Sequence, residues 1–138
     1  MSLIIDDTRD VVFLSSFDLF RRYIAKRSLD ELITDKRIQP ARIEEIVEKN
    51  QNEAEELIKD LGQKTLEEMG IYDVPEGIAP LIGKLRFRTS YGQNIILHSK
   101  EVAYIARSIA QLIGANEELA YRGGLLHDIG KALDHDIE

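Results

Sequence analysis

The sequence predicts a mainly helical protein with a short antiparallel β-hairpin at its N-terminus. Hydrophobic residues make up 43% of the 138 residues, and most of them recur at helical spacings of three and four. Aromatic residues are only 7%, with no Trp, which favours helices over a β-sandwich. Two short runs typical of β-strands near the start predict the hairpin. The length corresponds to about one domain.

The hairpin and a first helix are predicted before residue 37. Residues 3–5 and 11–14 are apolar runs, and the polar residues between them are predicted to form the hairpin loop. Ser15, followed three residues later by Asp18, resembles a capping box. We therefore expect a helix that starts near Phe17 and carries an apolar stripe.

A long second helix is predicted from Pro40 to Met69. Proline suits the first turn of a helix, and the apolar stripe that follows continues for about five turns. From Ala41 to Met69, nine acidic residues outnumber four basic ones, so this helix is expected to repel nucleic acid. It is interpreted as a connector or a dimerisation strut. Gly70 is predicted to end it, and residues 75–80 to form a turn-rich join.

Two further helices are predicted in the C-terminal third. The first begins after Gln93, carries an apolar stripe and ends at Gly114, a residue suited to a helix C-cap. The second begins at Asn116, which suits an N-cap and is followed by two acidic residues. This last helix is predicted to stop near Gly130.

Composition and charge exclude several classes of function. The chain contains no Cys, which excludes disulfides and thiolate metal sites and fits a reducing, cytoplasmic location. The net charge of −7 argues against nonspecific electrostatic binding of nucleic acid by the whole surface but permits a local basic patch. No apolar run approaches the ~20 residues that span a bilayer, and no secretory leader opens the chain. We expect no membrane segment in this chain.

All three histidines lie in the last 41 residues. His127 and Asp128 are adjacent near the end of an apolar helix, and neighbouring side chains on a helix point ~100° apart. Both can bind one metal ion only with a local bend and with ligands from another helix. His98 is a candidate third ligand if the two helices pack antiparallel. Imidazole and carboxylate ligands without thiolate suit Mn, Fe, Ni, Zn or Mg. His135 is interpreted as a surface residue or a support for the ligands.

These motifs resemble a known family. The string His-Asp-Ile-Gly-Lys at residues 127–131, with His98 upstream, is similar to the HD phosphohydrolase superfamily. Longer strings resemble the ribonuclease Y family of bacterial endoribonucleases, and they occur in order over nearly the whole chain. These strings cover residues 3–8, 38–45, 85–94, 97–99, 101–103 and 124–132.

The resemblance implies a domain plan. The family combines a membrane-anchoring helix, a coiled coil, a KH RNA-binding domain and an HD nuclease domain, in that order. On this plan, residues 1–37 are the C-terminal part of a KH-like domain, and residues 38–79 are a linker helix and turn. Residues 80–138 are the N-terminal part of the HD domain. The Gly-x-x-Gly loop with which KH domains clamp RNA is absent from the chain.

The resemblance also implies roles for individual residues. His98, His127 and Asp128 are expected as metal ligands, and Asp128 is also expected to be catalytic. Lys131 is expected to be catalytic through a phosphate oxygen, with a solvent-facing lysine as the alternative.

A short basic stretch is a candidate RNA-binding edge. Its basic residues alternate with Leu85 and Phe87, which predicts an extended segment with its charges on one side. The alternative is an ordinary exposed linker. The RNA-binding candidates are Lys84, Arg86 and Arg88.

The expected function follows from the resemblance. The parent protein would be a metal-dependent endoribonuclease, anchored at the cytoplasmic face of the membrane, that cleaves single-stranded mRNA to initiate its decay. Its cofactor would be a divalent ion (Mn, Mg or Zn), held weakly or not at all by this chain, which is expected to be inactive alone. Expected partners are single-stranded RNA, a second copy of the chain and the mRNA-decay machinery.

Two alternatives stay open. The chain could be an oligomerisation or scaffold segment without catalysis, because the long helix suits a dimer strut. It could instead belong to another HD-type phosphohydrolase that acts on nucleotides, although the KH-like N-terminal portion argues against this.

Overall fold

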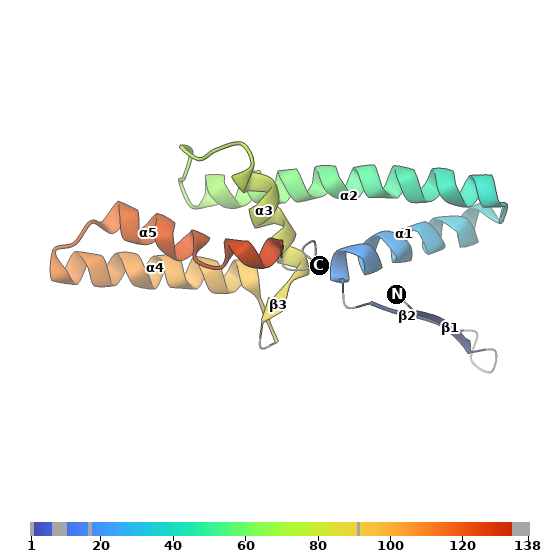
Figure 1. Cartoon of the computed structure of the whole chain (residues 1–138), viewed down its shortest axis with the longest axis horizontal. Helices are drawn as coiled ribbons and strands as arrows, with labels where there is room; N and C mark the ends of the chain where they lie inside the picture. The colour runs from blue at the N-terminus through green and yellow to red at the C-terminus, as the bar shows by residue number, and fades with distance from the viewer. Residues whose placement is uncertain (1, 7–10, 17, 91, 134–138) are drawn as a thin grey trace. The chain divides into compact units, whose positions relative to one another are not determined.

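The computed structural model describes residues 2–6, 11–16, 18–90 and 92–133. The predicted fold class, mainly helical with a short N-terminal antiparallel hairpin, is confirmed (Figure 1). The chain divides into two compact units, Met1–Leu57 and Ile58–Glu138.

The first unit begins with the hairpin. Strands β1 (Ser2–Asp6) and β2 (Val11–Ser15) pair antiparallel, with Ser2 opposite Ser15. Five large hydrophobic residues of the hairpin are exposed and Leu14 is half-buried, so the hairpin buries little apolar surface within the described residues. These exposed residues are Leu3, Ile4, Ile5, Val12 and Phe13.

Helix α1 (Leu19–Asp35) begins two residues later than predicted. Asp18 is its N-cap: one carboxylate oxygen accepts the backbone N–H groups of Phe20 and Arg21 at 2.9 and 3.1 Å. Ser15, predicted to open a capping box, lies in β2 instead. An acidic side chain beside free N–H groups also interacts favourably with the helix dipole, which explains why Asp18 caps the helix.

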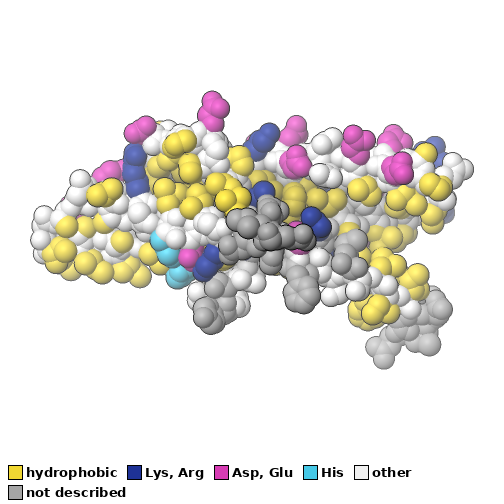
Figure 2. All heavy atoms as spheres, viewed as in Figure 1, with side chains coloured by type: hydrophobic (Ala, Val, Ile, Leu, Met, Phe, Trp, Pro, Cys, Tyr) yellow, Lys and Arg dark blue, Asp and Glu magenta, His cyan; other side chains and the backbone are white. Residues whose placement is uncertain are grey.

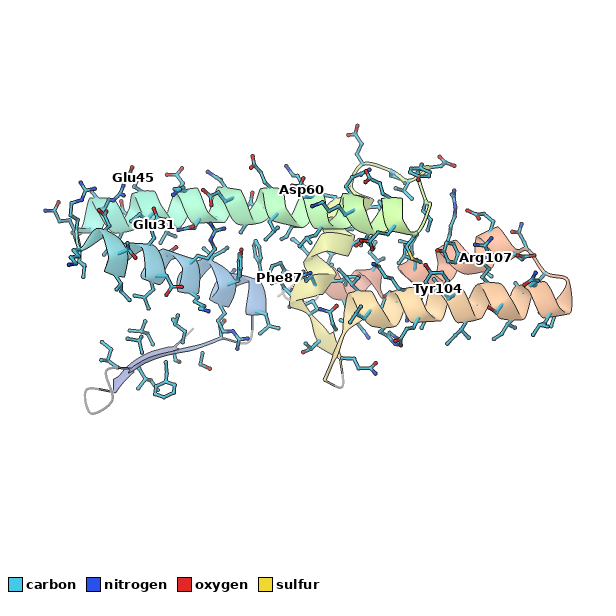
Figure 3. The ribbon with its side chains drawn as sticks, turned by 180° about the vertical axis from the view of Figure 1, so that it is seen from behind. Glu31, Glu45, Asp60, Phe87, Tyr104 and Arg107 are labelled. Atoms are coloured by element: carbon cyan, nitrogen blue, oxygen red, sulfur yellow. The ribbon has the colours of Figure 1, made fainter. Side chains whose placement is uncertain are left out.

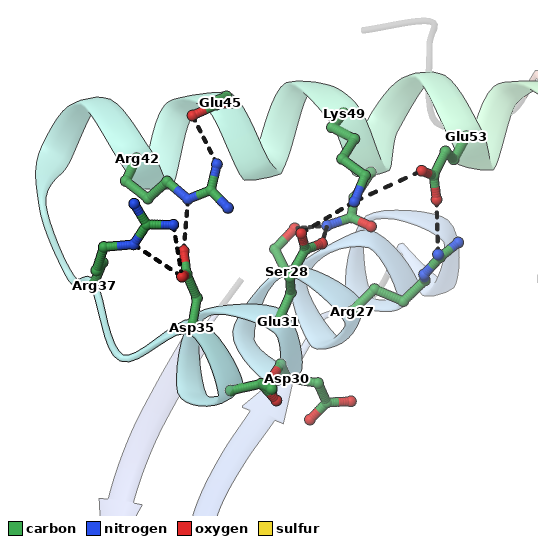
Figure 4. A network of polar contacts seen from close by, with 12 residues as sticks. Arg27, Ser28, Asp30, Glu31, Asp35, Arg37, Arg42, Glu45, Lys49 and Glu53 are labelled. Atoms are coloured by element: carbon green, nitrogen blue, oxygen red, sulfur yellow. Dashed lines mark hydrogen bonds and ion pairs between the residues drawn. The ribbon is translucent and has the colours of Figure 1, made fainter.

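Helix α2 (Pro40–Glu68) packs against α1 through polar contacts (Figure 4). Asn50 is buried and donates a hydrogen bond to the buried Ser28 hydroxyl at 3.3 Å. Hydrogen bonds from Arg42 and Arg37 hold the pKa of Asp35 below its usual value. Basic residues of both helices thus offset part of the acidic charge. The ion pairs between the helices are Arg27–Glu53, Lys49–Glu31 and Arg42–Asp35.

The second unit contains the end of α2 and the remaining elements, with α4 and α5 side by side (Figure 1). Gly114 ends α4 in the left-handed conformation (φ +69°), and the Asn116 side chain caps α5, both as predicted. The elements are α3 (Ile78–Lys84), η1 (Leu85–Phe87), β3 (Thr89–Ser90), β4 (Gln93–Asn94), α4 (Ile95–Ile113), α5 (Glu117–Leu126) and η2 (Ile129–Ala132).

Helix α3 lies against the end of α2 with its backbone in contact. A Cβ atom added at Gly62 would lie 1.6 Å from the Ala79 carbonyl oxygen, and one at Gly83 would lie 1.8 Å from that of Ile58. Only glycine fits such contacts. The main core of the unit comprises Leu66, Met69, Ile71, Ile82, Ala103, Tyr121 and Leu125.

The prediction of an extended segment over residues 84–88 is wrong. Helix α3 continues to Lys84, a 3₁₀ turn follows, and only Arg88 is extended (φ −117°, ψ 141°). The alternation of charged and apolar residues suggested a strand, but Ile82 and Leu85 are both buried at a spacing of three. That helical spacing determines the conformation.

Two further features concern the ends of helices. Gly70 follows α2 with φ +67°, as predicted for the residue that ends it. The join predicted over residues 75–80 is shorter than expected, because α3 begins at Ile78. Pro80 lies in the first turn of α3, where a missing N–H is tolerated.

Among the helices that the structure describes, none has the length and apolarity needed to cross a bilayer.

Candidate metal centre

Helices α4 and α5 bring the candidate ligands together. The Asn94 side chain accepts the Ile96 N–H at 3.0 Å and so fixes the start of α4, which places His98 near that end of the helix. Helix α5 ends at Leu126, and His127 and Asp128 lie in the break between α5 and η2. This break is the local bend that two adjacent ligands require.

The three side chains form one cluster. The Asp128 Oδ2 atom lies 3.4 Å from His127 Nε2 and 4.0 Å from His98 Nε2. The imidazole rings meet edge to face, with centroids 5.3 Å apart. Both histidines are partly accessible, and the Asp128 side chain is 17% exposed. Figure 2 shows histidine side chains at the surface beside an acidic and a basic side chain.

A backbone contact orients His127. Its Nδ1 atom lies 2.7 Å from the Gly124 carbonyl oxygen. Because a carbonyl only accepts hydrogen bonds, Nδ1 carries the proton in this contact, and in the neutral ring Nε2 then has a free lone pair. That lone pair is on the side of Asp128, as a metal ligand requires.

Lys131 interacts with Asp128 rather than with solvent alone. The Lys131 ammonium donates to Asp128 Oδ2 at 2.8 Å. This hydrogen bond, followed by the charges of His127, Lys131 and His98, lowers the pKa of Asp128 from its usual value. The carboxylate is therefore ionised at neutral pH, and a cation that binds Oδ2 must displace the Lys131 ammonium.

Close packing of the helix backbones fixes the position of α5 against α4. A Cβ atom added at Gly124 would lie 2.6 Å from Ala103 Cα and 2.9 Å from Ala103 N. Any larger residue would push α5 away from α4. Two adjacent glycines inside a helix, Gly123 and Gly124, usually indicate a packing requirement, and this signal could have predicted the contact.

The donor set fits a divalent ion. One ligand atom from each of His98, His127 and Asp128 lies within 4.8 Å of the others. Neighbouring ligands of a tetrahedral ion, each about 2.0–2.2 Å from it, lie about 3.3–3.6 Å apart, so the widest separation in the cluster must shrink by roughly 1 Å. Two imidazoles and one carboxylate without thiolate suit Mn, Fe, Ni, Zn or Mg, and three ligands leave positions open for water.

The other predicted site residues have different surroundings. Arg86 is exposed and lines a cavity with residues of α2 and α4. Lys84 and Arg88 are half-buried, and the predicted common face of the three basic residues is not formed because η1 is a 3₁₀ turn. His135 lies outside the described residues.

Comparison with known proteins gave consistent matches. The HD domain family model matches residues 95–138. Ribonuclease Y of Aquifex aeolicus strain VF5 is 54% identical over 137 residues, which are 99% of this chain and 25% of that protein. Ribonuclease Y of Bacillus subtilis strain 168 is 49% identical over 138 residues, which are 100% of this chain and 26% of that protein. No solved structure matches.

The matches cover all or nearly all of this chain but only part of each relative. The chain spans about a quarter of the length of the curated relatives it matches. Its HD match begins at the start of α4 and includes all three residues of the cluster. With about half of its residues identical over its whole length, the chain is homologous to a segment of ribonuclease Y, and its residues 95–138 match the HD domain.

Proposed function

We propose that this chain supplies part of the metal centre of an endoribonuclease that cleaves single-stranded RNA and so initiates mRNA decay. The proposal is based on the cluster of His98, His127 and Asp128. The cluster lies at the start of α4 and just after α5, within the segment that matches the HD domain. The names of the relatives support ribonuclease activity for the whole protein.

Each residue of the cluster has a proposed role. His98 and His127 bind the ion through Nε2, and the Gly124 carbonyl holds His127 in the required tautomer. Asp128 supplies the anionic ligand. A bound divalent ion supplies the Lewis acid that lowers the pKa of water and neutralises charge on phosphoryl oxygens. Lys131, released from Asp128, contacts a phosphate oxygen of the RNA.

The remaining parts of the chain have proposed roles in the longer protein. Residues 1–37 belong to a KH-like domain, residues 38–79 form a linker, and residues 80–138 belong to the HD domain. Lys84, Arg86 and Arg88 do not share one face, and we propose that they contact RNA near the metal centre as separate residues. The longer protein is anchored at the cytoplasmic face of the membrane and works with the mRNA-decay machinery.

A metal titration tests this proposal. Isothermal titration calorimetry with Mn²⁺ or Zn²⁺ should show weak binding by this chain, because the residues that the structure describes supply three ligands. Asp128→Asn should abolish the binding, since it removes the anionic ligand with little change of shape. Asp60→Asn is the matched control: Asp60 is exposed on α2 (Figure 3) and lies outside the cluster. Equal binding by the two variants would contradict the metal centre.

A cleavage assay then tests the reaction. The 138-residue chain should leave a labelled single-stranded RNA intact, whereas the longer protein should cleave it in the presence of the divalent ion. Asp128→Asn in the longer protein should abolish cleavage without unfolding it. Cleavage at the normal rate by that variant would refute the assigned role.

Self-association is a second candidate function, and a specific observation favours it. The second unit exposes many large hydrophobic residues on α4 and α5, and Leu112 is 86% exposed. Such surfaces are typical of protein–protein contacts, and we assign this one to a second copy of the chain. The exposed residues are Leu97, Tyr104, Ile105, Ile109, Leu112, Ile113 and Leu119.

Sedimentation of two variants tests self-association. Leu112→Glu should convert a concentration-dependent dimer to a monomer. The neighbouring Gln111→Glu introduces the same charge at another exposed position and should leave the dimer unchanged. A wild-type chain that stays monomeric at high concentration would exclude this function.

A further inference from the structure

A second site lies beside the first turns of α4. A cavity of about 440 Å³ opens between the last turns of α2, the 3₁₀ turn η1 and the start of α4. This volume is typical of small-ligand sites. Its lining includes Leu97 and Lys100 but none of the three residues of the metal centre. It is therefore a separate site on the same helix.

The cavity is positively charged in a negatively charged protein. Its lining holds three basic residues, Lys64, Arg86 and Lys100, and one acidic residue, Glu68. The chain as a whole carries −7. A local excess of positive charge against such a background is an anion-binding feature rather than a consequence of composition.

Two of these cations have no carboxylate partner. Lys100 pairs with Glu68, and its hydrogen bond lowers the pKa of Glu68. Within the residues that the structure describes, neither Lys64 nor the Arg86 guanidinium has an acidic partner. Both free cations are therefore available to a ligand.

The surrounding backbone adds to the positive potential. Ile96 and Leu97 belong to the first turn of α4, a helix of 19 residues, and both line the cavity. A helix N-terminus carries a partial positive charge, which favours a nearby anion even though the Ile96 N–H is already bonded to the Asn94 side chain. Asn94 donates a hydrogen bond to the Arg86 carbonyl at 3.1 Å and so attaches η1 to the start of α4.

We propose that this cavity binds a phosphate group of the RNA strand, through Lys64, Arg86 and Lys100, next to the strand's scissile phosphate at the metal centre. The proposal rests on the RNA-cleaving function above and adds a binding site to it. His98 follows Leu97 directly, so one turn of α4 contributes to both sites. Contacts of this kind position a strand without reading its sequence.

The salt dependence of RNA binding tests the proposal. Anisotropy of a labelled oligouridine is measured with the 138-residue chain in EDTA, so that neither metal binding nor cleavage contributes. For single strands, each phosphate contact contributes about 0.7 to the slope of log K against log salt concentration. Because the cavity binds one phosphate, Lys64→Gln and Arg86→Gln should each reduce the slope, by at most about 0.7, the total that one phosphate contributes. Lys59→Gln, an exposed α2 lysine outside the cavity, should leave it unchanged.

The outcomes separate the two proposals. If Lys64→Gln and Lys59→Gln give the same slope, or if the wild-type chain does not bind the oligonucleotide, the RNA site in this cavity is excluded. If inorganic phosphate protects the wild-type chain against thermal unfolding but not Lys64→Gln, and the RNA slopes are equal, the cavity binds free anions instead. None of these results alters Mn²⁺ binding at Asp128, which tests the proposed function separately.

Discussion

Replacing Gly124 by Ala should separate the two halves of the metal centre without touching a ligand. The added methyl group would lie 2.6 Å from Ala103 Cα, a distance that real Cβ contacts essentially never show. The clash is with backbone, so no side-chain rotation relieves it, and α5 must move away from α4. His98 lies on α4, whereas His127 and Asp128 follow α5, so this movement separates the ligands.

The size of the effect follows from the geometry. Overpacking a close-packed interior usually lowers the free energy of unfolding by about 1–3 kcal/mol, and a clash with backbone lies at the upper end of that range. Alanine has a higher helix propensity than glycine, which raises the free energy of unfolding by about 1 kcal/mol and offsets part of this loss. The net expectation is a loss of about 2 kcal/mol, which lowers the melting temperature by roughly 8–16 °C for a unit of this size.

The neighbouring glycine provides the control. A Cβ atom at Gly123 meets nothing within 4 Å among the described atoms, so Gly123→Ala should gain up to about 1 kcal/mol from helix propensity alone. Both variants are measured by circular dichroism melting and by Mn²⁺ titration. Gly123→Ala should bind the ion normally, and Gly124→Ala should bind it more weakly. Equal melting temperatures and equal affinities for the two variants would refute the packing argument.

Two further predictions concern Lys131 and Tyr121. Lys131→Met removes the ammonium that is bonded to Asp128 Oδ2. The Mn²⁺ affinity measured by calorimetry should therefore rise about fivefold, which is equivalent to the loss of an ion pair worth about 1 kcal/mol. A lower affinity would show that Lys131 supports the ligands. Burial raises the pKa of Tyr121 to about 12, above the ordinary tyrosine value of about 10. The contribution of the neutral Tyr121 side chain to stability is therefore complete below pH ~10 and is lost as the pH rises through the folded-state pKa. Tyr121→Phe should therefore reduce the alkaline loss of stability in denaturant titrations, and an unchanged pH profile would contradict this assignment.

Local sequence signals predicted the elements whose ends are set by single residues. Gly70, Gly114 and Asn116 each satisfy a backbone requirement that only a few residue types meet, and the structure uses all three as predicted. The segment around Arg86 was mispredicted because its alternating pattern is short. Burial of Ile82 and Leu85 against other parts of the second unit determined its conformation, and no local pattern reports such contacts.

Other features depend on contacts between residues far apart in the sequence. Lys64 and Lys100 line one cavity only because the end of α2 lies beside the start of α4, and neither belongs to a recognisable motif. Ser99 is buried, and its hydroxyl has no hydrogen-bond partner in the described part of the chain. Nothing in its sequence neighbourhood indicates this, since a serine on a helix is ordinarily assigned to the surface.

The metal centre shows how ligand identity and packing together make a site. The adjacent His127 and Asp128 are recognisable in sequence, but the two point apart on a regular helix and become joint ligands only because α5 ends before them. The third ligand, His98, lies 29 positions before His127 and is brought to them by the backbone contact at Gly124. The same glycine accepts the His127 hydrogen bond through its carbonyl. Gly124 therefore sets both the separation of the two helices and the tautomer of one ligand, so the site depends on this residue although it binds no ion itself.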